Sequence, residues 1–143
     1  MRKFIRGSSS YVRIELHVSM VVKYRHKVFD IVQFRTRCEA LLRETAQRIG
    51  IQIIELGFDR DHLHMVILLA VTHRLDKVMK SMKGTSGRKL LHEFPEVKRR
   101  YFWKSGLWSG AIFGDSLGSE PEKLYAYVKN QGKKKYQTLE AFL

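Results

Sequence analysis

The segment HLHMVILLA, from His62 to Ala70, is the feature that most restricts the fold of this chain. A short apolar run that follows polar turn residues is typical of a strand buried in the middle of a sheet. Two histidines stand at its start. Because alternate residues of a strand point to the same face, the imidazoles of His62 and His64 are expected side by side, with Leu63 and Met65 in the core. The chain should therefore form a sheet whose central strand carries two polar rings at one end.

The segments around this strand alternate in type. Apolar residues of period two indicate strands, apolar residues at helical spacing indicate helices, and the polar stretch DRD suits a hairpin before His62. The predicted elements are a strand over Tyr11–Val22, a helix over Val28–Ile49 ended by Gly50, a strand over Ile51–Phe58, the strand from His62, a helix over Leu75–Phe94 interrupted at KGTSG and stopped by Pro95, a glycine-broken strand over Leu107–Gly118 after a basic linker, and a short C-terminal helix.

The order β-α-β-β-α-β followed by a helix predicts an α+β fold. We expect a ferredoxin-like (RRM-like) antiparallel sheet with two helices packed on one face, and an additional C-terminal helix available for another role. With 143 residues, the chain is expected to form one domain over residues 1–143.

The charge of the chain is strongly unbalanced, with 27 Lys and Arg against 14 Asp and Glu, a net +13 at pH 7. This excess favours nucleic acid as the partner over the plainer alternative of a basic but unspecialised surface. No apolar run approaches the roughly 20 residues of a membrane-spanning helix, and the basic start MRKFIRG leads into serines rather than a signal peptide. We therefore expect a cytoplasmic protein that does not bind membranes. The single cysteine, Cys38, is expected to pack in a helix.

The C-terminal segment YAYVKNQ contains the other chemical groups that the histidine pair needs. On a helix, Tyr127 and Gln131 share a face at positions i and i+4, whereas Tyr125 points elsewhere. A metal held by His62 and His64 could polarise a phosphate and make attack by a phenol feasible, and the Gln131 amide could complete a site suited to Mg²⁺ or Mn²⁺. The plainer alternatives are exposed strand histidines, a packed tyrosine and a surface amide. These residues taken singly leave both possibilities open.

Four stretches, DHLHMVILL, MKGTSGRKLLHEFP, LWSGAIFGDSLG and YAYVKNQ, resemble in order and spacing the single-tyrosine HUH transposases of small single-strand insertion sequences, the transposase A type that includes the REP-associated tyrosine transposases. The early LHVSMVVKYRHKVF also resembles the first strand and basic exit turn of that family, although SMVV departs from its usual longer aromatic stretch. The resemblance covers the chain from about Tyr11 to Gln131.

The resemblance implies that His62 and His64 are the metal-binding HUH pair, that Tyr127 is the nucleophile and that Gln131 is the third metal ligand. It implies a transposase that binds DNA hairpins at element ends, and that cleaves and rejoins single-stranded DNA through a 5′-phosphotyrosine bond with Mg²⁺ or Mn²⁺. It also implies a homodimer in which the tyrosine helix can complete the partner's site in trans. Glycines flank residues 120–132, so we expect this tyrosine-bearing helix to be mobile.

DNA contacts are expected from three basic groups. The last of them, Lys98, Arg99 and Arg100, runs into Tyr101, Phe102 and Trp103, and exposed aromatic rings beside cations could stack on unpaired bases. For Trp103 and Trp108, core packing is favoured over stacking. His17, His26, His73 and His92 are expected to be structural or DNA-facing. The candidate DNA-binding residues are Lys23, Arg25, Lys27, Lys83, Arg88, Lys98, Arg99 and Arg100.

Two other functions compete with the transposase. A non-catalytic single-stranded nucleic-acid-binding domain of RRM-like fold would need aromatic residues on its central strands, and HLHMVILLA has none. A metal-dependent hydrolase would keep the histidines and use water in place of Tyr127.

Overall fold

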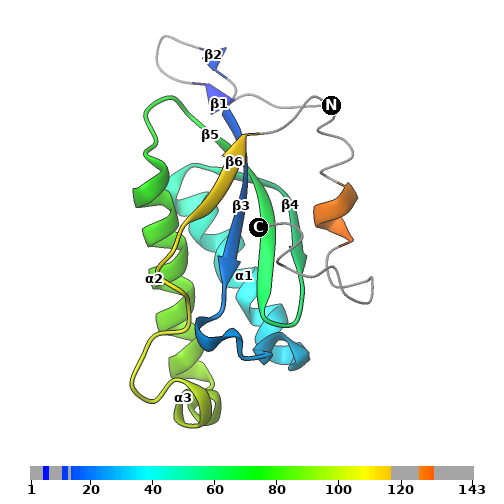
Figure 1. Cartoon of the computed structure of the whole chain (residues 1–143). Helices are drawn as coiled ribbons and strands as arrows, with labels where there is room; N and C mark the ends of the chain where they lie inside the picture. The colour runs from blue at the N-terminus through cyan, green and yellow to red at the C-terminus, as the bar shows by residue number, and fades with distance from the viewer. Residues whose placement is uncertain (1–4, 7–10, 13, 117–125, 131–143) are drawn as a thin grey trace.

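The computed structural model describes residues 5–6, 11–12, 14–116 and 126–130. Its secondary structure is shown in Figure 1. The strands are β1 (Ile5–Arg6), β2 (Tyr11–Val12), β3 (Ile14–Val21), β4 (Gln52–Phe58), β5 (His62–Leu69) and β6 (Phe113–Ser116), and the helices are η1 (Lys23–Arg25), η2 (Val28–Asp30), α1 (Val32–Ile49), α2 (Leu75–Glu93) and α3 (Pro95–Tyr101).

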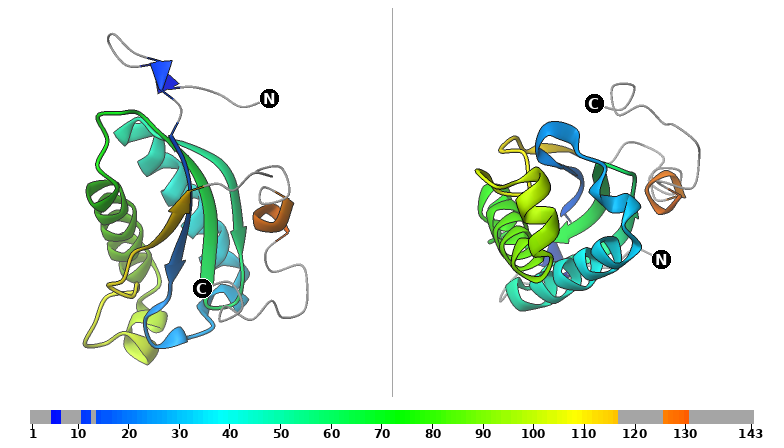
Figure 2. Two further views of the ribbon diagram at one scale, coloured as in Figure 1. Left: turned by 45° about the horizontal axis from the view of Figure 1, so that its top comes forward. Right: turned by 90° about the horizontal axis from the view of Figure 1, so that it is seen from below.

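Four strands form one antiparallel sheet in the order β4-β5-β3-β6, with β3 and β5 in the centre. The helices α1 and α2 cover one face of this sheet (Figures 1 and 2). Side chains of alternate residues of β3 and β5 form the core against these helices, among them Val18, Met20, Leu63 and Met65. All eight residues of β5 are buried, so this strand is covered on both faces. The α+β class is confirmed, and β5 is central as its apolar composition predicts.

The first helix begins later than its apolar spacing predicts. Residues Val28–Asp30 form the separate 3₁₀ turn η2, and α1 starts only at Val32. The amide of Phe29 donates to the carbonyl of Arg60 in the β4–β5 hairpin, and its ring packs edge-on against Phe58. The apolar residues of this turn therefore pack on the hairpin without continuing the helix. The predicted end is confirmed, because Gly50 caps α1 in the left-handed conformation with φ of 78°.

The predicted interruption of the second helix at KGTSG is wrong, because α2 runs without a break through these residues. Ser86 donates its hydroxyl to the Met82 carbonyl and accepts a hydrogen bond from Nε1 of Trp108. A Cβ atom at Gly87 would lie 3.3 Å from Cδ1 of Trp108. Small residues here thus make room for the buried indole rather than breaking the helix. The packing expected for Trp108 is confirmed, whereas Trp103 is 65% exposed and the packing expected for it is wrong.

The remaining segments differ from expectation in length. Pro95 ends α2 as predicted but also begins α3, which occupies much of the expected basic linker. The predicted strand over Leu107–Gly118 is a strand only at Phe113–Ser116, preceded by an isolated bridge between Trp108 and Val22. The short pair β1–β2 was not expected.

The predicted mobile helix over residues 120–132 is described only in part. Residues 126–130 lie within the described part of the chain, and 126–129 are helical.

Among the described residues, no helix has both the length and the apolar character needed to cross a bilayer.

The two glycines of α2 should respond differently to alanine. Gly84 has no atom within 4 Å of a built Cβ, so Gly84→Ala should raise the free energy of unfolding by about 0.5–1 kcal/mol through helix propensity. Gly87→Ala should lose this gain, because Trp108 must move. Urea unfolding followed by circular dichroism measures both variants. Equal stabilisation by both would contradict the packing role assigned to Gly87.

Candidate active site

His62 and His64 lie at the start of β5 on the face of the sheet opposite the core-facing Leu63 and Met65. Both imidazoles are buried, their ring centroids are 5.0 Å apart and their planes are perpendicular. The β4–β5 hairpin positions them, because the amide of Asp59 donates to the His62 carbonyl at 2.8 Å. The side-by-side arrangement predicted from their spacing is thus present. The alternative of exposed strand histidines is excluded.

The ring of His62 is oriented by Asp61. Its Nδ1 lies 2.7 Å from Oδ1 of Asp61, whose other oxygen accepts a hydrogen bond from Nε of Arg25 at 3.0 Å. Burial alone would raise the pKa of Asp61, but hydrogen bonds from His62 and Arg25 outweigh it, so the pKa lies below its ordinary value. A carboxylate only accepts, so Nδ1 of His62 carries the hydrogen of this contact, and Nε2 is the ring nitrogen left for another partner. Among the described residues this buried Nε2 has no hydrogen-bond partner.

The ring of His64 is held from strand β3. Ser19 is its cross-strand neighbour, and Nδ1 of His64 lies 2.7 Å from the Ser19 hydroxyl and 2.9 Å from Nε2 of His17. Burial, reinforced by the neighbouring His17 and His62, lowers the pKa of His64 to about 2. Burial lowers the pKa of His17 to about 4, against a smaller opposing effect of Asp115. Both rings are therefore neutral at pH 7, which is the form of imidazole that binds metal ions.

Tyr127 reaches this face of the sheet from the C-terminal segment. Its ring centroid lies 6.2 Å from that of His64, at an interplanar angle of 71°. The adjacent Val128 is fully buried, whereas Ala126 and Lys129 are exposed. This helical turn lies on the side of the sheet away from α2 (Figure 2). The phenol is thus beside the histidine pair of its own chain.

The third predicted ligand, Gln131, lies outside the described residues. Within the described part of the chain, no cluster of three or more His, Cys, Asp or Glu side chains is arranged to hold a metal ion. The described residues therefore contribute two imidazoles and one phenol. A metal ion here would need further ligands, such as an amide oxygen, DNA or water.

His17 is the site residue that the sequence did not identify. It lies two residues before Ser19 on β3 and so shares its face, but only the strand pairing places both against His64. The signal available was a histidine and a serine at alternate positions of a strongly apolar strand. His73 is structural, because its Nδ1 accepts the Ala70 amide and its Nε2 donates to the Ile49 carbonyl.

Four of the eight candidate DNA-binding residues make contacts within the fold or are half-buried, and the other four are exposed. The ammonium groups of Lys83 and Lys98 donate to backbone carbonyls of the fold. Nζ of Lys83 donates to the carbonyls of Ser109 and Ala111, and burial lowers the pKa of Lys83. Nζ of Lys98 donates to the carbonyls of Phe102 and Ser105. Arg25 pairs with Asp61, and Lys23 is half-buried. The other four, Lys27, Arg88, Arg99 and Arg100, are exposed.

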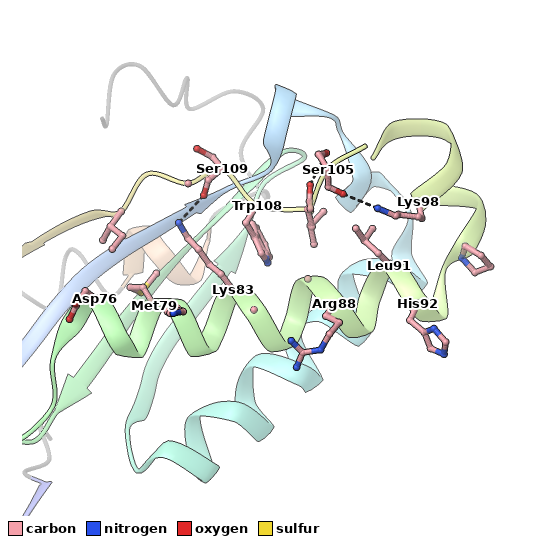
Figure 3. A pocket seen from close by; sticks show the side chains of 18 residues that line it. Asp76, Met79, Lys83, Arg88, Leu91, His92, Lys98, Ser105, Trp108 and Ser109 are labelled. Carbon is pink, nitrogen blue, oxygen red and sulfur yellow. Dashed lines mark hydrogen bonds between the residues drawn. The ribbon is translucent and has the colours of Figure 1, made fainter. Parts of the chain in front are cut away.

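A pocket of about 870 Å³ lies between α2 and residues 105–112 (Figure 3). Leu91, Trp108 and other apolar side chains line it together with Lys83, Arg88 and Lys98. Its lining includes neither the histidine pair nor Tyr127, so it is separate from the candidate active site.

Solved structures share this fold, and two of them show the extent of the similarity. A Deinococcus radiodurans protein superposes with a TM-score of 0.73 at 23% identity, covering 89% of this chain and 97% of that one. A REP-associated tyrosine transposase bound to a REP hairpin superposes with a TM-score of 0.60 at 10% identity, covering 90% of this chain and 70% of that one. At these identities, the likeness is one of fold.

Sequence relationships show the family. The family model described as "Transposase IS200 like" matches residues 10–131, so the chain belongs to the IS200-like transposase family. The ISDra2 transposase TnpA of Deinococcus radiodurans is 26% identical over 104 residues, or 73% of each chain. The IS200 transposase of Salmonella typhimurium is 25% identical over 115 residues, or 80% of this chain and 74% of that one. The resemblance noted from the motifs is confirmed, and the protein is a transposase of insertion-sequence type.

The buried imidazoles should make stability fall with acid. Between the ordinary histidine pKa of 6.5 and the lowered pKa of His17 near 4, the unfolded chain binds protons that folded His17 and His64 do not. The free energy of unfolding should fall as pH drops through this range, by at most about 1.4 kcal/mol per pH unit for each group. His17→Gln should have a shallower slope, and His92→Gln is the control at an exposed imidazole. Urea unfolding in EDTA measures this; equal slopes for wild type and His17→Gln would contradict it.

Proposed function

We propose that this transposase cleaves and rejoins single-stranded DNA through a covalent 5′-phosphotyrosine bond to Tyr127. A divalent cation, Mg²⁺ or Mn²⁺, would be held by His62, His64 and Gln131. The observation that carries the proposal is the ring of Tyr127, 6.2 Å from that of a buried, neutral His64. These groups lie far apart in the sequence, and no apolar packing requirement explains two imidazoles buried opposite a phenol.

The chemistry of the histidine pair fits a cation of this kind. Asp61 places the hydrogen of His62 on Nδ1, which leaves the buried Nε2 as the donor atom for a metal ion. Contacts from Ser19 and His17 orient His64 in the same way, from its Nδ1 side. When bound, the cation supplies polarisation of an oxygen on the scissile phosphate. The contacts of Asp61, Ser19 and His17 keep the two imidazoles in place.

In the proposed step, Oη of Tyr127 attacks phosphorus. The Tyr–O–P bond forms, the bond between phosphorus and the 3′-oxygen breaks, the phenol loses its proton and the leaving oxygen gains one. The fragment that carries the 5′-phosphate stays attached to the protein through Tyr127, and the other fragment ends in a free 3′-OH. Attack by a 3′-OH on the phosphotyrosine reverses the step and joins strands. One phosphodiester replaces another, so no external energy source is needed.

The proposed substrate is a DNA hairpin with single-stranded flanks at the ends of an element. The net charge of +13 favours a polyanion, and the REP-associated neighbour of the same fold is described as bound to a REP hairpin. We further propose a homodimer that acts on cytoplasmic DNA. In this chain Tyr127 lies at its own histidine pair; exchange of the tyrosine segment between subunits would give composite sites in trans.

Loss of the phenol should abolish the covalent step. With labelled single-stranded hairpin DNA from the gene's own locus and Mg²⁺ or Mn²⁺, the wild type should give a protein–DNA adduct and cleaved strand on a denaturing gel. Tyr127→Phe should give neither, a loss of at least about 10³-fold because the nucleophile is absent. EDTA should also prevent the adduct, and duplex DNA should stay intact.

Tyr125→Phe is the matched control, since it removes the neighbouring phenol and should retain the adduct. Cleavage by Tyr127→Phe would instead support a hydrolase that uses water. Binding without cleavage by the wild type would support the non-catalytic RRM-like alternative.

Substitutions of two adjacent cations on α3 should have different effects, one on DNA binding and the other on stability. Arg99 is exposed, so Arg99→Ala should weaken single-stranded DNA binding and reduce the slope of log affinity against log salt by about 1. Lys98→Met should lower the free energy of unfolding by about 1 kcal/mol or more, because two carbonyls lose their donor. Fluorescence anisotropy across a salt series and urea unfolding measure the two effects. An unchanged salt slope for Arg99→Ala would remove Arg99 from the DNA surface.

A further inference from the structure

The turn after β3 has an unusual backbone. Tyr24 and Arg25 are consecutive non-glycine residues with positive φ, 61° and 57°, and no other non-glycine residue of the described chain has one. Residues with Cβ atoms rarely adopt this conformation. Hydrogen bonds hold the turn in place, from the Lys23 amide to the Leu107 carbonyl at 2.8 Å and from the Arg25 amide to the Val22 carbonyl at 2.9 Å.

The Tyr24 side chain gains little burial from this strained backbone. It is 67% exposed, the highest value among the large hydrophobic side chains that are exposed in the described structure. A packing role would bury the ring, and a simple turn would favour Gly or Asn at this φ. An exposed aromatic ring on a strained turn is instead characteristic of a functional position.

The surroundings of Tyr24 suit a nucleic-acid base. The ring meets His26 edge-on at 5.9 Å between centroids, and His26 in turn contacts Tyr101 at 4.6 Å. Nζ of Lys23 lies 5.8 Å from the Tyr24 ring centroid, and the exposed Lys27 follows closely in the chain. Aromatic faces bordered by cations bind single-stranded DNA by stacking on bases while neutralising phosphates.

This turn is also connected to the candidate active site. Arg25, the neighbour of Tyr24, pairs with Asp61 at 3.0 Å, and Asp61 orients His62 at 2.7 Å. The amide of Val22 donates to the Asp61 carbonyl at 2.9 Å. A strand that stacks a base on Tyr24 would therefore lie next to the histidine pair.

We propose that Tyr24 is a stacking platform for one unpaired nucleobase of the strand that enters the active site. The proposal rests on the proposed function for the identity of that strand as single-stranded DNA. Lys23 and Lys27 bind the flanking phosphates. Stacking reads the π face that every base has, so this site holds the strand in place without selecting its sequence.

Exposed Trp103 shares two of these features but lacks the others. It is 65% exposed and Nζ of Lys104 lies 4.5 Å from its ring centroid, but its backbone has no positive φ. No described contact links it to the histidine pair. The features that point to a base therefore coincide at Tyr24.

The test replaces the ring while keeping the backbone. Asn tolerates positive φ, so Tyr24→Asn should be at least as stable to urea as the wild type. It should bind the labelled single-stranded hairpin about 5- to 150-fold more weakly, the affinity equivalent of one stacked base. Tyr24→Phe retains the ring and should bind within about twofold of the wild type by the same scale. Fluorescence anisotropy measures all three affinities.

Abasic substitution identifies the partner base. With single abasic sites placed along the flank, the wild type should lose affinity at one position, and Tyr24→Asn should lose nothing further there. Wild-type affinity in Tyr24→Asn, or the same abasic penalties in both proteins, would overturn the proposal. The adduct formed by the wild type on the intact strand tests the proposed function separately. If the adduct forms but Tyr24→Asn binds normally, only the stacking site is wrong.

Discussion

The antiparallel pairing of β3 with β5 is the constraint on which the rest of the structure depends. The two strands are in register over their full lengths, with Ser19 opposite His64 and Val21 opposite His62. Side chains alternate, so this register sends one set of residues into the core below α1 and α2 and the other to the face with the histidine pair. A slip of one residue would put two imidazoles into the apolar core. The apolar packing of one face therefore fixes the polar site on the other.

Burial has a chemical consequence on that second face. Burial keeps His17 and His64 neutral, because a charged ring in the sheet would lose the hydration that it has in water. Neutral rings still need partners for their polar atoms, and the Ser19 hydroxyl and the second imidazole provide them at His64. His64 is thus held by hydrogen bonds between uncharged groups. A cationic ligand would meet lone pairs here rather than competing protons.

Much of this organisation was predictable from local patterns, and the exceptions have physical causes. Period two identified β3 and a continuous apolar run identified β5. The i and i+2 spacing placed His62 beside His64, and Gly50 marked the end of α1. The uninterrupted α2 was missed because Gly87 and Ser86 serve a tertiary contact with Trp108, which spacing along the chain does not reveal. His17 was missed because its role depends on strand pairing.

The same limit applies to Tyr127 and Gln131. Helical spacing placed them on one face, but only the family resemblance implied that this face meets the histidines. The structure brings the Tyr127 ring to His64. Gln131 stays a prediction.

The two imidazoles are supported in different ways. His64 is held from inside the sheet by residues of β3, whose positions follow from backbone pairing and apolar packing. His62 is held from the rim, through Asp61 and an ion pair with the 43%-exposed Arg25. Salt and nearby phosphates screen an exposed pair far more than a buried hydrogen bond. The orientation of His62 is therefore the part of the site that responds to the ionic surroundings, while His64 stays fixed by the fold.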